Sequence, residues 1–416
     1  MAVIHAGRRT TYGELTALRR RYESQEALRS GARIGVAIRD PASWIAALGA
    51  LDSAGANALL LGARDSDELV VLRSTLNLDD LWQTSTPPEQ AGETAPSERP
   101  GTVTLLTSGT TGEPKTIEHS WETLARPVRH GEGQEDARWL CAYPLRLYAG
   151  TQVMLQALVN GATLVIPEAP DPATVANLIV EAGVTHASGT PTFWRQLCLF
   201  GGRRSLARSE LQQITLGGEA VPQDLLEALR KTVPSARIVH IYASTELGRL
   251  FSVTDGREGF PAEYLDAVPG GRVELEIRDG ELFARSANAM IGGEDWTATG
   301  DLVQRVSGRV VFRGRRTDII NVGGSKVSPL RVEAALRQVE GVADLRIYSK
   351  SSSLAGQLVA CDLVAEPAAD PEEVKARLLK HARASLSAPE QPRIVRLVER
   401  IDSTAALKVA RGERES

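Results

Sequence analysis

Short apolar segments alternate with helical stretches through the first 240 residues of this chain. Strand-like runs are found at residues 33–38, 57–61, 102–107, 162–166, 184–188 and 237–242. Segments of helical spacing lie between them, at residues 12–24, 41–54, 120–127, 150–159, 172–182 and 222–232. Because parallel strands need long crossover connections, which helices supply, this alternation favours a parallel-rich sheet with helices on its faces. The sequence therefore predicts an α/β fold.

The pattern of predicted secondary structure changes near residue 268. Short strands separated by Gly, Asp-Gly or Ser-Gly turns, typical of a β-meander, are expected at residues 273–278, 281–286, 302–306 and 309–313. A Gly-Gly loop, helices at 329–339 and 371–386, and strands at 343–348 and 356–364 then indicate a small α+β unit. We expect a large N-terminal domain, residues 1–314, and a small C-terminal lid domain, residues 315–416. The polar, proline-rich residues 84–101 are expected to form a linker or surface loop.

Charge and cysteine content narrow the class of protein. The 48 basic and 52 acidic residues give a net charge of −4, which argues against a nucleic-acid partner bound through bulk charge. The three cysteines and six histidines lack the spacing of a disulfide framework or a metal cluster. No leader-like apolar segment opens the chain, and no run of 18 apolar residues follows. We therefore expect a cytoplasmic protein with no membrane partner.

The motif richest in chemical information is Thr107-Ser-Gly-Thr-Thr-Gly-Glu-Pro-Lys115, which directly follows the apolar run Val103–Leu106. Glycines let backbone N–H groups turn toward an anion, hydroxyls add donors, and a lysine adds a point charge. An ordinary Ser/Gly hairpin can have a similar composition. The motif is not a Walker loop, because Pro114 precedes the lysine where that loop has glycine. The nonapeptide therefore predicts a phosphate-binding loop.

Five further segments carry residues suited to the same ligand. In chain order they are Leu216–Pro222, Tyr242–Glu246, Thr299–Asp301, Gly314–Pro329 and Thr404–Lys408. Glu246 follows a predicted strand, at the edge where open α/β sheets bind ligands, and the Asp301 carboxylate can accept hydrogen bonds from two neighbouring hydroxyls. Taken alone, Glu246 is equally a solvated loop residue, Asp301 a turn residue and Lys408 a solvated charge.

Together, and in this order, the six motifs resemble those of the adenylate-forming ligase superfamily, which includes acyl- and aryl-CoA synthetases, aryl-acid AMP ligases, peptide-synthetase adenylation domains and luciferases. The resemblance covers nearly the whole chain. It implies an ATP-dependent enzyme that activates a carboxylic acid to acyl-AMP, releases pyrophosphate and passes the acyl group to a thiol. That thiol belongs to coenzyme A or to the phosphopantetheine of a carrier protein.

The resemblance also assigns roles to individual residues. The phosphates of ATP are held by Thr107, Ser108, Gly109, Thr110, Thr111, Gly112 and Lys115. The adenine lies against Gly217, Gly218 and Glu219 and stacks on Tyr242, which Ala243 and Ser244 follow. The ribose is contacted by Asp301 and Arg315. The catalytic residues are Thr245 at the phosphate, Glu246, which holds Mg²⁺, and Lys408.

The acid pocket is expected to be lined by Tyr143, Leu147, Tyr148, Ser188 and Gly189. The stretch Asn321–Pro329 most resembles the aryl-acid and acyl-CoA ligase branches, which favours an aryl or small acyl acid. Phe193 and Trp194 either line this pocket or pack a helix. Two alternatives to a thiol ligase stay open: an amide-forming ligase with an amine acceptor, and a non-catalytic descendant that binds nucleotide.

The chain departs from the superfamily pattern at several points, among them the segment Tyr143–Gly150, which has no histidine near the acyl pocket. Ala243 stands where glycine is customary, Asp402 where proline is usual, and Leu407 where glycine usually precedes the lysine. The part before the phosphate motif is shorter than the superfamily leads one to expect. We therefore expect a compact member with a trimmed first subdomain.

Overall fold

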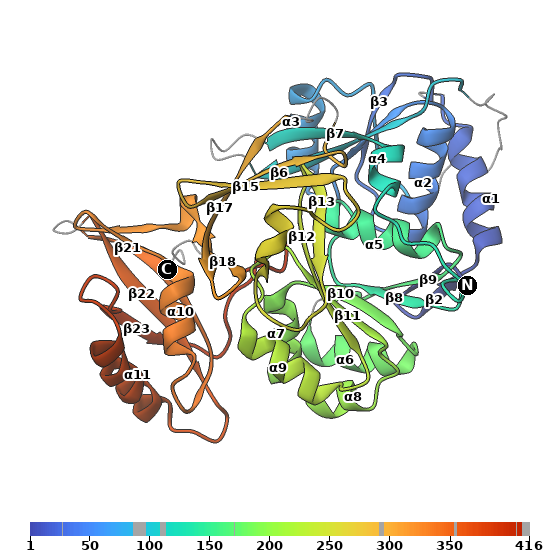
Figure 1. Cartoon of the computed structure of the whole chain (residues 1–416). Coiled ribbons are helices and arrows are strands. Elements are labelled where there is room, and N and C mark those ends of the chain that lie inside the picture. The colour runs from blue at the N-terminus through green and yellow to red at the C-terminus, as the bar shows by residue number, and fades with distance from the viewer. Residues whose placement is uncertain are drawn as a thin grey trace. The chain divides into compact units, whose positions relative to one another are not determined.

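The structure of the protein is a computed structural model that describes residues 1–26, 28–85, 97–108, 114–169, 171–290, 295–352, 356–404 and 406–409 (Figure 1). Most of the predicted surface loop, residues 86–96, lies outside the described residues. The chain forms two compact units. Unit 1 comprises Met1–Gly218, Glu227–Gly256 and Arg285–Asp295, and unit 2 comprises Glu219–Leu226, Arg257–Ala284 and Trp296–Ser416.

An eight-stranded sheet forms the larger part of unit 1. Its strand order is β13-β12-β11-β10-β8-β9-β1-β2. The bounds are β1 Val3–His5, β2 Arg8–Thr10, β8 Arg138–Cys141, β9 Thr163–Ile166, β10 His186–Gly189, β11 Gln213–Gly217, β12 Arg237–Ser244 and β13 Gly248–Val253. Neighbouring strands from β12 to β1 are parallel, and the edge strands β13 and β2 are antiparallel to their neighbours. The predicted parallel-rich sheet is confirmed.

A second sheet of unit 1 carries the strand before the phosphate motif. Its order is β5-β3-β4-β6-β7, and its strands are β3 Arg33–Val36, β4 Asn57–Leu60, β5 Asp80–Trp82, β6 Thr102–Ser108 and β7 Pro114–Ser120. Only β7 is antiparallel to its neighbour. The helices that connect the strands are α1 Tyr12–Glu23, α2 Pro41–Ser53, α3 Ser66–Thr75, α4 Trp121–Ala125, α5 Tyr148–Leu158, α6 Pro172–Glu181, α7 Pro191–Phe200, α8 Arg203–Ala207 and α9 Gln223–Thr232.

Several helices begin at a capping side chain followed by proline. Asp40, Asp171 and Thr190 each accept a hydrogen bond from a backbone N–H three residues on, and Ser328 and Asp370 do the same in unit 2. The cap satisfies a backbone donor that the helix leaves unpaired, and proline at the first helical position has the dihedral angle that the helix needs. These local signals explain why most of these helix starts were predicted to the residue.

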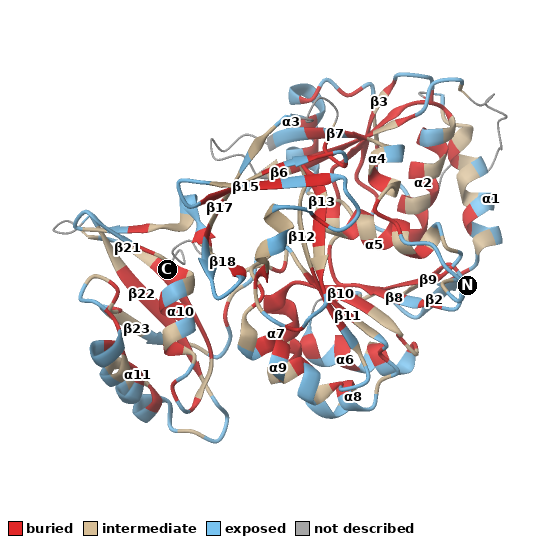
Figure 2. Ribbon diagram, in the orientation of Figure 1, coloured by how far each residue is buried: buried red, intermediate tan, exposed pale blue. Residues whose placement is uncertain are grey.

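Phe193 and Trp194 of α7 pack inside unit 1. The Trp194 side chain is fully buried, and its Nε1 donates to the carbonyl oxygen of Thr215 at 3.0 Å. The Phe193 ring lies so close to Gly189 that a Cβ there would collide with it. Figure 2 shows that buried residues concentrate in the strands and on one side of the helices. Of the two predicted roles for this aromatic pair, helix packing agrees with its burial.

A meander of antiparallel strands occupies the first part of unit 2. Its order is β14-β18-β17-β16-β15, with β14 Phe260–Pro261, β15 Val273–Arg278, β16 Glu281–Ser286, β17 Thr297–Val306 and β18 Arg309–Arg315. The meander was predicted, but β17 is longer than expected and includes Asp301, which the sequence placed in a turn. Gly300 takes a left-handed backbone (φ +76°), and the pairing of β16 with β17 shifts register here. A bulge replaces the expected turn.

The C-terminal part of unit 2 has a sheet and an apolar core of its own. Strands β20-β19-β22-β21 pair in this order and β23 pairs with β22; the bounds are β19 Ile320–Val322, β20 Ser325–Val327, β21 Val342–Ser352, β22 Gly356–Ala365 and β23 Ile394–Leu397. Helices α10 Pro329–Leu336 and α11 Pro371–Ser385 complete this part. The core includes Val332, Ile347, Cys361 and Leu378. An independent lid beginning at residue 315 stays a prediction. Among the described residues, no helix is long and apolar enough to cross a bilayer.

Protonation of His186 on β10 is expected to destabilise the fold. Its ring lies 4.7 Å from that of Trp139, and burial lowers its pKa below the usual 6.5. Because the unfolded chain then binds the proton more tightly, the stabilising contribution is full above about pH 6.5 and is lost as the pH falls toward the lower folded pKa. Urea unfolding from pH 8 to pH 5 should show a shallower pH slope for His186→Gln than for the wild type. Equal slopes would contradict this assignment.

Candidate active site

Four predicted segments meet at one edge of the eight-stranded sheet. Strands β8, β10, β11 and β12 run parallel, so their carboxyl ends share an edge. That edge carries Tyr143, Ser188–Gly189, Gly217–Gly218 and Tyr242–Glu246, each at or just after the end of its strand. Open α/β sheets bind ligands outside the carboxyl ends of their strands. The structure thus places predicted acid-pocket, adenine and catalytic residues together.

The phosphate motif is attached to the hairpin of β6 and β7. Thr107 pairs with Lys115 and Ser108 with Pro114 across the hairpin, and the Thr107 hydroxyl donates to the carbonyl oxygen of Lys115 at 3.5 Å. Gly109, Thr110, Thr111 and Gly112 lie outside the described residues. Lys115 Nζ is 4.0 Å from Glu246 Oε1, with the two side chains 58% and 31% exposed. Such an exposed pair contributes little to stability, so both charges are available to a ligand.

The turn that carries Thr245 and Glu246 is held by several hydrogen bonds. The backbone N–H of Leu247 donates to Ser244 Oγ at 3.1 Å, and that of Met290 donates to the carbonyl oxygen of Glu246 at 2.7 Å. Gly248 closes the turn with a left-handed backbone (φ +69°), and a Cβ there would collide with Asn288. The Glu246 carboxylate therefore projects from a fixed backbone.

His119 on β7 is a buried residue of this site that the sequence analysis set aside. Its Nε2 lies 2.7 Å from the carbonyl oxygen of Thr245, and because that oxygen only accepts, Nε2 must carry the proton. Burial lowers the pKa of His119, against smaller opposing effects of the Thr245 hydrogen bond and the Glu246 charge. His119 lies four residues after Lys115, on the same face of the strand. The spacing of His119 from Lys115 was the signal in the sequence that could have assigned His119 to this site.

The Tyr242 ring lies 5.2 Å from that of Phe251, between their centroids, and Ala243 follows at a shift in the pairing of β12 with β13. Ala243 does not have a left-handed backbone and packs against the core of unit 1. Its methyl group therefore carries no conformational cost, which explains why alanine is acceptable where glycine is customary.

The predicted acid-pocket residues differ in their surroundings. Tyr143 is buried, and its hydroxyl donates to the carbonyl oxygen of Gly217 at 3.2 Å, which links the acid and adenine segments. Leu147 is the N-cap residue of α5, and the ring of buried Tyr148 lies 5.9 Å from that of His119. The carbonyl oxygen of Ser188 accepts from Ala142 N, and Gly189 makes room for Phe193. Burial raises the pKa of Tyr148, so its hydroxyl stays protonated.

Unit 2 brings together the two residues assigned to the ribose. Asp301 and Arg315 are opposite each other on β17 and β18, and Arg315 Nε lies 3.2 Å from Asp301 Oδ1. The Asp301 side chain is largely buried and that of Arg315 is half exposed. A buried carboxylate with one oxygen held by a guanidinium keeps acceptor capacity for hydroxyl groups.

Lys408 lies in a short turn of unit 2. The backbone N–H of Thr404 donates to the carbonyl oxygen of Lys408 at 2.7 Å, and the N–H of Val409 donates to Glu219 Oε1 at 2.8 Å. Leu407 has a left-handed backbone (φ +57°), which explains why glycine is usual at this position. The leucine costs about 1–2 kcal/mol in backbone strain, and burial of its side chain offsets that cost.

Sequence comparison places the chain among known proteins. Residues 62–292 match the family described as AMP-binding enzyme, and residues 331–408 match the AMP-binding enzyme C-terminal domain. The chain belongs to the AMP-binding enzyme family. The superfamily membership expected from the six motifs is confirmed.

The known proteins similar to this AMP-binding enzyme include several acid–CoA ligases. A 2-succinylbenzoate–CoA ligase from Listeria monocytogenes is 25% identical over 330 residues, which are 74% of this chain and 68% of that protein. The structure of an o-succinylbenzoate CoA synthetase from Bacillus subtilis, in complex with its acyl-adenylate intermediate, matches with a TM-score of 0.75 and 21% identity, over 100% of this chain and 95% of the other. A benzoate CoA ligase from Burkholderia xenovorans matches with a TM-score of 0.79 and 22% identity, over 99% and 95%. These likenesses confirm the α/β fold class.

The residues of this AMP-binding enzyme fit a magnesium ion that arrives with a nucleotide. Magnesium bound to nucleotides uses one or two carboxylates and completes its shell with phosphates and water. Glu246 offers one partly exposed carboxylate on a fixed turn, 4.0 Å from Lys115 Nζ. Thr107, which pairs with Lys115 across the hairpin, carries a hydroxyl. Within the described ranges, no group of three or more His, Cys, Asp or Glu residues could hold a metal ion by itself. The donor set therefore suits a metal shared with substrate.

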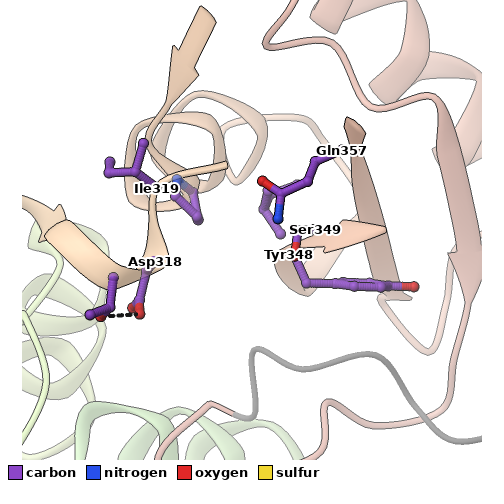
Figure 3. Close-up of a pocket in the computed structure, with 8 residues that line it drawn as sticks. Asp318, Ile319, Tyr348, Ser349 and Gln357 are labelled. Carbon is purple, nitrogen blue, oxygen red and sulfur yellow. Dashed lines mark hydrogen bonds between the residues drawn. The ribbon is translucent and has the colours of Figure 1, made fainter. Parts of the chain in front are cut away.

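A separate cavity of about 180 Å³ lies in the C-terminal part of unit 2. Figure 3 shows Asp318 and Ile319 on one side of it and Tyr348, Ser349 and Gln357 on the other. None of the residues assigned to ATP or to the acid lines it. The cavity therefore adds nothing to the candidate active site.

Proposed function

We propose that this AMP-binding enzyme activates a carboxylic acid with ATP to form acyl-AMP and pyrophosphate, and then transfers the acyl group to the thiol of coenzyme A. The observation that carries the proposal is the placement of Lys115 and the Thr245–Glu246 turn beside the carboxyl ends of β10, β11 and β12. The family match and the acid–CoA ligase names of the relatives support it.

In the first half-reaction the substrate carboxylate attacks the α-phosphorus of ATP, and the bond from that phosphorus to the pyrophosphate oxygen breaks. Negative charge grows on the phosphate oxygens, so fixed positive groups lower the barrier. Lys115 and Lys408 supply positive charge, and the Thr107 hydroxyl and backbone N–H groups supply donors. A magnesium ion held by Glu246 would neutralise phosphate charge and orient the leaving group.

In the second half-reaction the thiol attacks the carbonyl carbon of acyl-AMP and AMP leaves. We assign the acceptor side to the lid, residues 315–416, and to its Gly323–Gly324 turn. Both glycines have left-handed backbones (φ +53° and +87°) and connect β19 to β20. Without side chains they permit close approach of a narrow pantetheine arm. A carrier-protein phosphopantetheine presents the same thiol and is the second acceptor to be assayed.

We propose an aryl or small acyl acid as the substrate. The relatives' names support an aromatic acid, since they include 2-succinylbenzoate and benzoate. Tyr143 follows β8 at the edge that carries the other acid-pocket residues, and Tyr148 begins α5 with its ring 5.9 Å from that of His119. Flat aromatic rings pack favourably against aromatic side chains.

ATP–pyrophosphate exchange with a panel of acids tests this function. We expect exchange with at least one of benzoate, 2-succinylbenzoate, anthranilate and short fatty acids, and none with the standard amino acids. Coenzyme A, a phosphopantetheinylated carrier protein and simple amines are then compared as acceptors. Exchange with amino acids alone would place the protein in another branch. An absence of exchange with every acid, combined with tight ATP binding, would favour a non-catalytic descendant.

A further inference from the structure

Glu281 is a buried carboxylate that none of the six motifs contains. It begins β16, and its residue is only 5% exposed. Its Oε1 accepts a hydrogen bond from the backbone N–H of Gly300 at 3.0 Å. Its Oε2 accepts from the guanidinium of Arg316 and forms an ion pair with it. The Glu281 side chain therefore connects β16 to β17 and to the residue that follows β18.

The two partners of Glu281 flank the residues assigned to the ribose. Gly300 immediately precedes Asp301, and Arg316 immediately follows Arg315. Asp301 and Arg315 are themselves paired at 3.2 Å. Glu281 therefore contacts the backbone just before Asp301 and the side chain of the residue just after Arg315.

The surrounding backbone reinforces this arrangement. The Thr299 hydroxyl donates to the carbonyl oxygen of Leu282 at 2.7 Å and accepts from the N–H of Asp301 at 3.2 Å. Gly300 lies between them with its left-handed backbone. Two consecutive residues of β16, Glu281 and Leu282, therefore hold the bulge by hydrogen bonds, and the bulge sets the position of Asp301.

Burial of Glu281 is costly in free energy unless its charge is matched, and the structure matches it at both oxygens. The Arg316 side chain is 63% exposed, so it could form an ion pair equally well with a carboxylate at the surface. Stability from the ion pair alone therefore does not explain why Glu281 is buried. The buried position brings the carboxylate within reach of the Gly300 N–H at the same time as Arg316. The geometry points to a role in fixing the bulge.

We propose that Glu281 is a positioning residue that aligns Asp301 and Arg315 for the hydroxyl groups of the nucleotide ribose. The inference rests on the proposed function, since it takes ATP as the substrate. Glu281 acts through the Gly300 backbone and through Arg316, and does not itself touch the nucleotide. Loss of the carboxylate releases the bulge and costs the protein its recognition of the ribose hydroxyls.

The test measures equilibrium binding of ATP and of 2′,3′-dideoxy-ATP by calorimetry, with Mg²⁺ and without the acid. The wild type should bind ATP more tightly than the dideoxy analogue. In Glu281→Ala this preference should fall by about 10-fold, while the affinity for the analogue changes little. Glu281→Gln keeps an acceptor for the Gly300 N–H but loses the ion pair, so its loss should be intermediate. Glu276→Gln, an exposed change on neighbouring β15, is the matched control.

Each outcome has a defined meaning. An unchanged preference in Glu281→Ala, or an equal loss of affinity for both nucleotides, would overturn the positioning role while leaving the proposed function intact. A wild type that binds both nucleotides equally would overturn the ribose assignment and the inference with it. A wild type that does not bind ATP would overturn the proposed function as well. If Glu281→Ala fails to fold, Glu281→Gln and Arg316→Met decide the question through the same ratio.

Discussion

A Lys408→Ala variant is expected to form acyl-AMP at least about 100-fold more slowly than the wild type, yet to transfer the acyl group from presynthesised acyl-AMP at nearly the normal rate. In the proposed first step the lysine ammonium binds the attacking carboxylate and stabilises the negative charge that grows on the α-phosphate. In the second step the phosphate leaves as AMP, and attack by the thiol needs no cation from this position. The two half-reactions therefore separate at this residue.

The structure indicates that the variant should keep its fold. The turn around Lys408 is held by backbone groups, through the Thr404 N–H to the Lys408 carbonyl and the Val409 N–H to Glu219. Alanine leaves these bonds in place. Single-turnover formation of acyl-AMP and transfer from synthetic acyl-AMP should be measured on the same preparation, with the thermal midpoint as a check on folding.

Gly324→Leu is the reciprocal variant. Gly324 has a left-handed backbone (φ +87°), which is strained for any side chain other than asparagine or aspartate. A leucine side chain would also fill the space at the turn. We expect transfer to the thiol to fail while acyl-AMP still forms. Gly324→Asn, which tolerates the same backbone, is the matched control. We expect this opposite pair of defects if residues 315–416 act as a lid that rotates about a hinge near Thr317–Asp318. A Lys408→Ala variant that loses both steps equally, or neither, would contradict lid rotation.

Local signals account for the parts of the fold that the sequence predicted well. The capping residue and proline before α2, α6, α10 and α11 are contiguous in the chain, as are the glycine turns of the meander. Short strands such as β1 were missed. Val3 on β1 pairs with Leu164 on β9, and a three-residue strand has too few residues to show a period. Its partner lies 161 residues away in the chain, so no local pattern marks the strand.

The candidate site likewise contains residues that local sequence motifs identify and residues that only distant contacts identify. The motifs named the residues at the ends of β11 and β12, because each motif is a contiguous string with its own chemistry. His119 and Glu281 carry no such string, and their roles come from contacts with Thr245 and with Gly300. The sequence treated His119 as one of six histidines without ligand spacing. Its spacing from Lys115 places both residues on one face of β7, but its contact with Thr245 comes from the packing of the β6–β7 hairpin.

A Glu246→Gln variant is expected to release pyrophosphate at least about 100-fold more slowly than the wild type at low Mg²⁺, with its thermal midpoint lowered by no more than about 4 °C. The amide is neutral and binds a divalent cation weakly. The stability effect is small because the only ion pair recorded for Glu246 within the described ranges is the exposed 4.0 Å contact with Lys115. Pyrophosphate release and thermal unfolding should be measured together.

A magnesium titration separates a metal-binding role of Glu246 from a structural one. If the carboxylate holds the metal, the variant should need a higher Mg²⁺ concentration for half-maximal activity, and excess Mg²⁺ should restore part of the rate. If Glu246 only orients Lys115, the rate falls without a shift in this concentration. Glu122→Gln, a change of the same kind at an exposed helix position paired with Arg126, should leave both the rate and the Mg²⁺ requirement unaltered. Because the Glu246 backbone is fixed by Met290 and by the Gly248 turn, an altered Mg²⁺ requirement in Glu246→Gln reports the lost carboxylate charge and not a displaced turn.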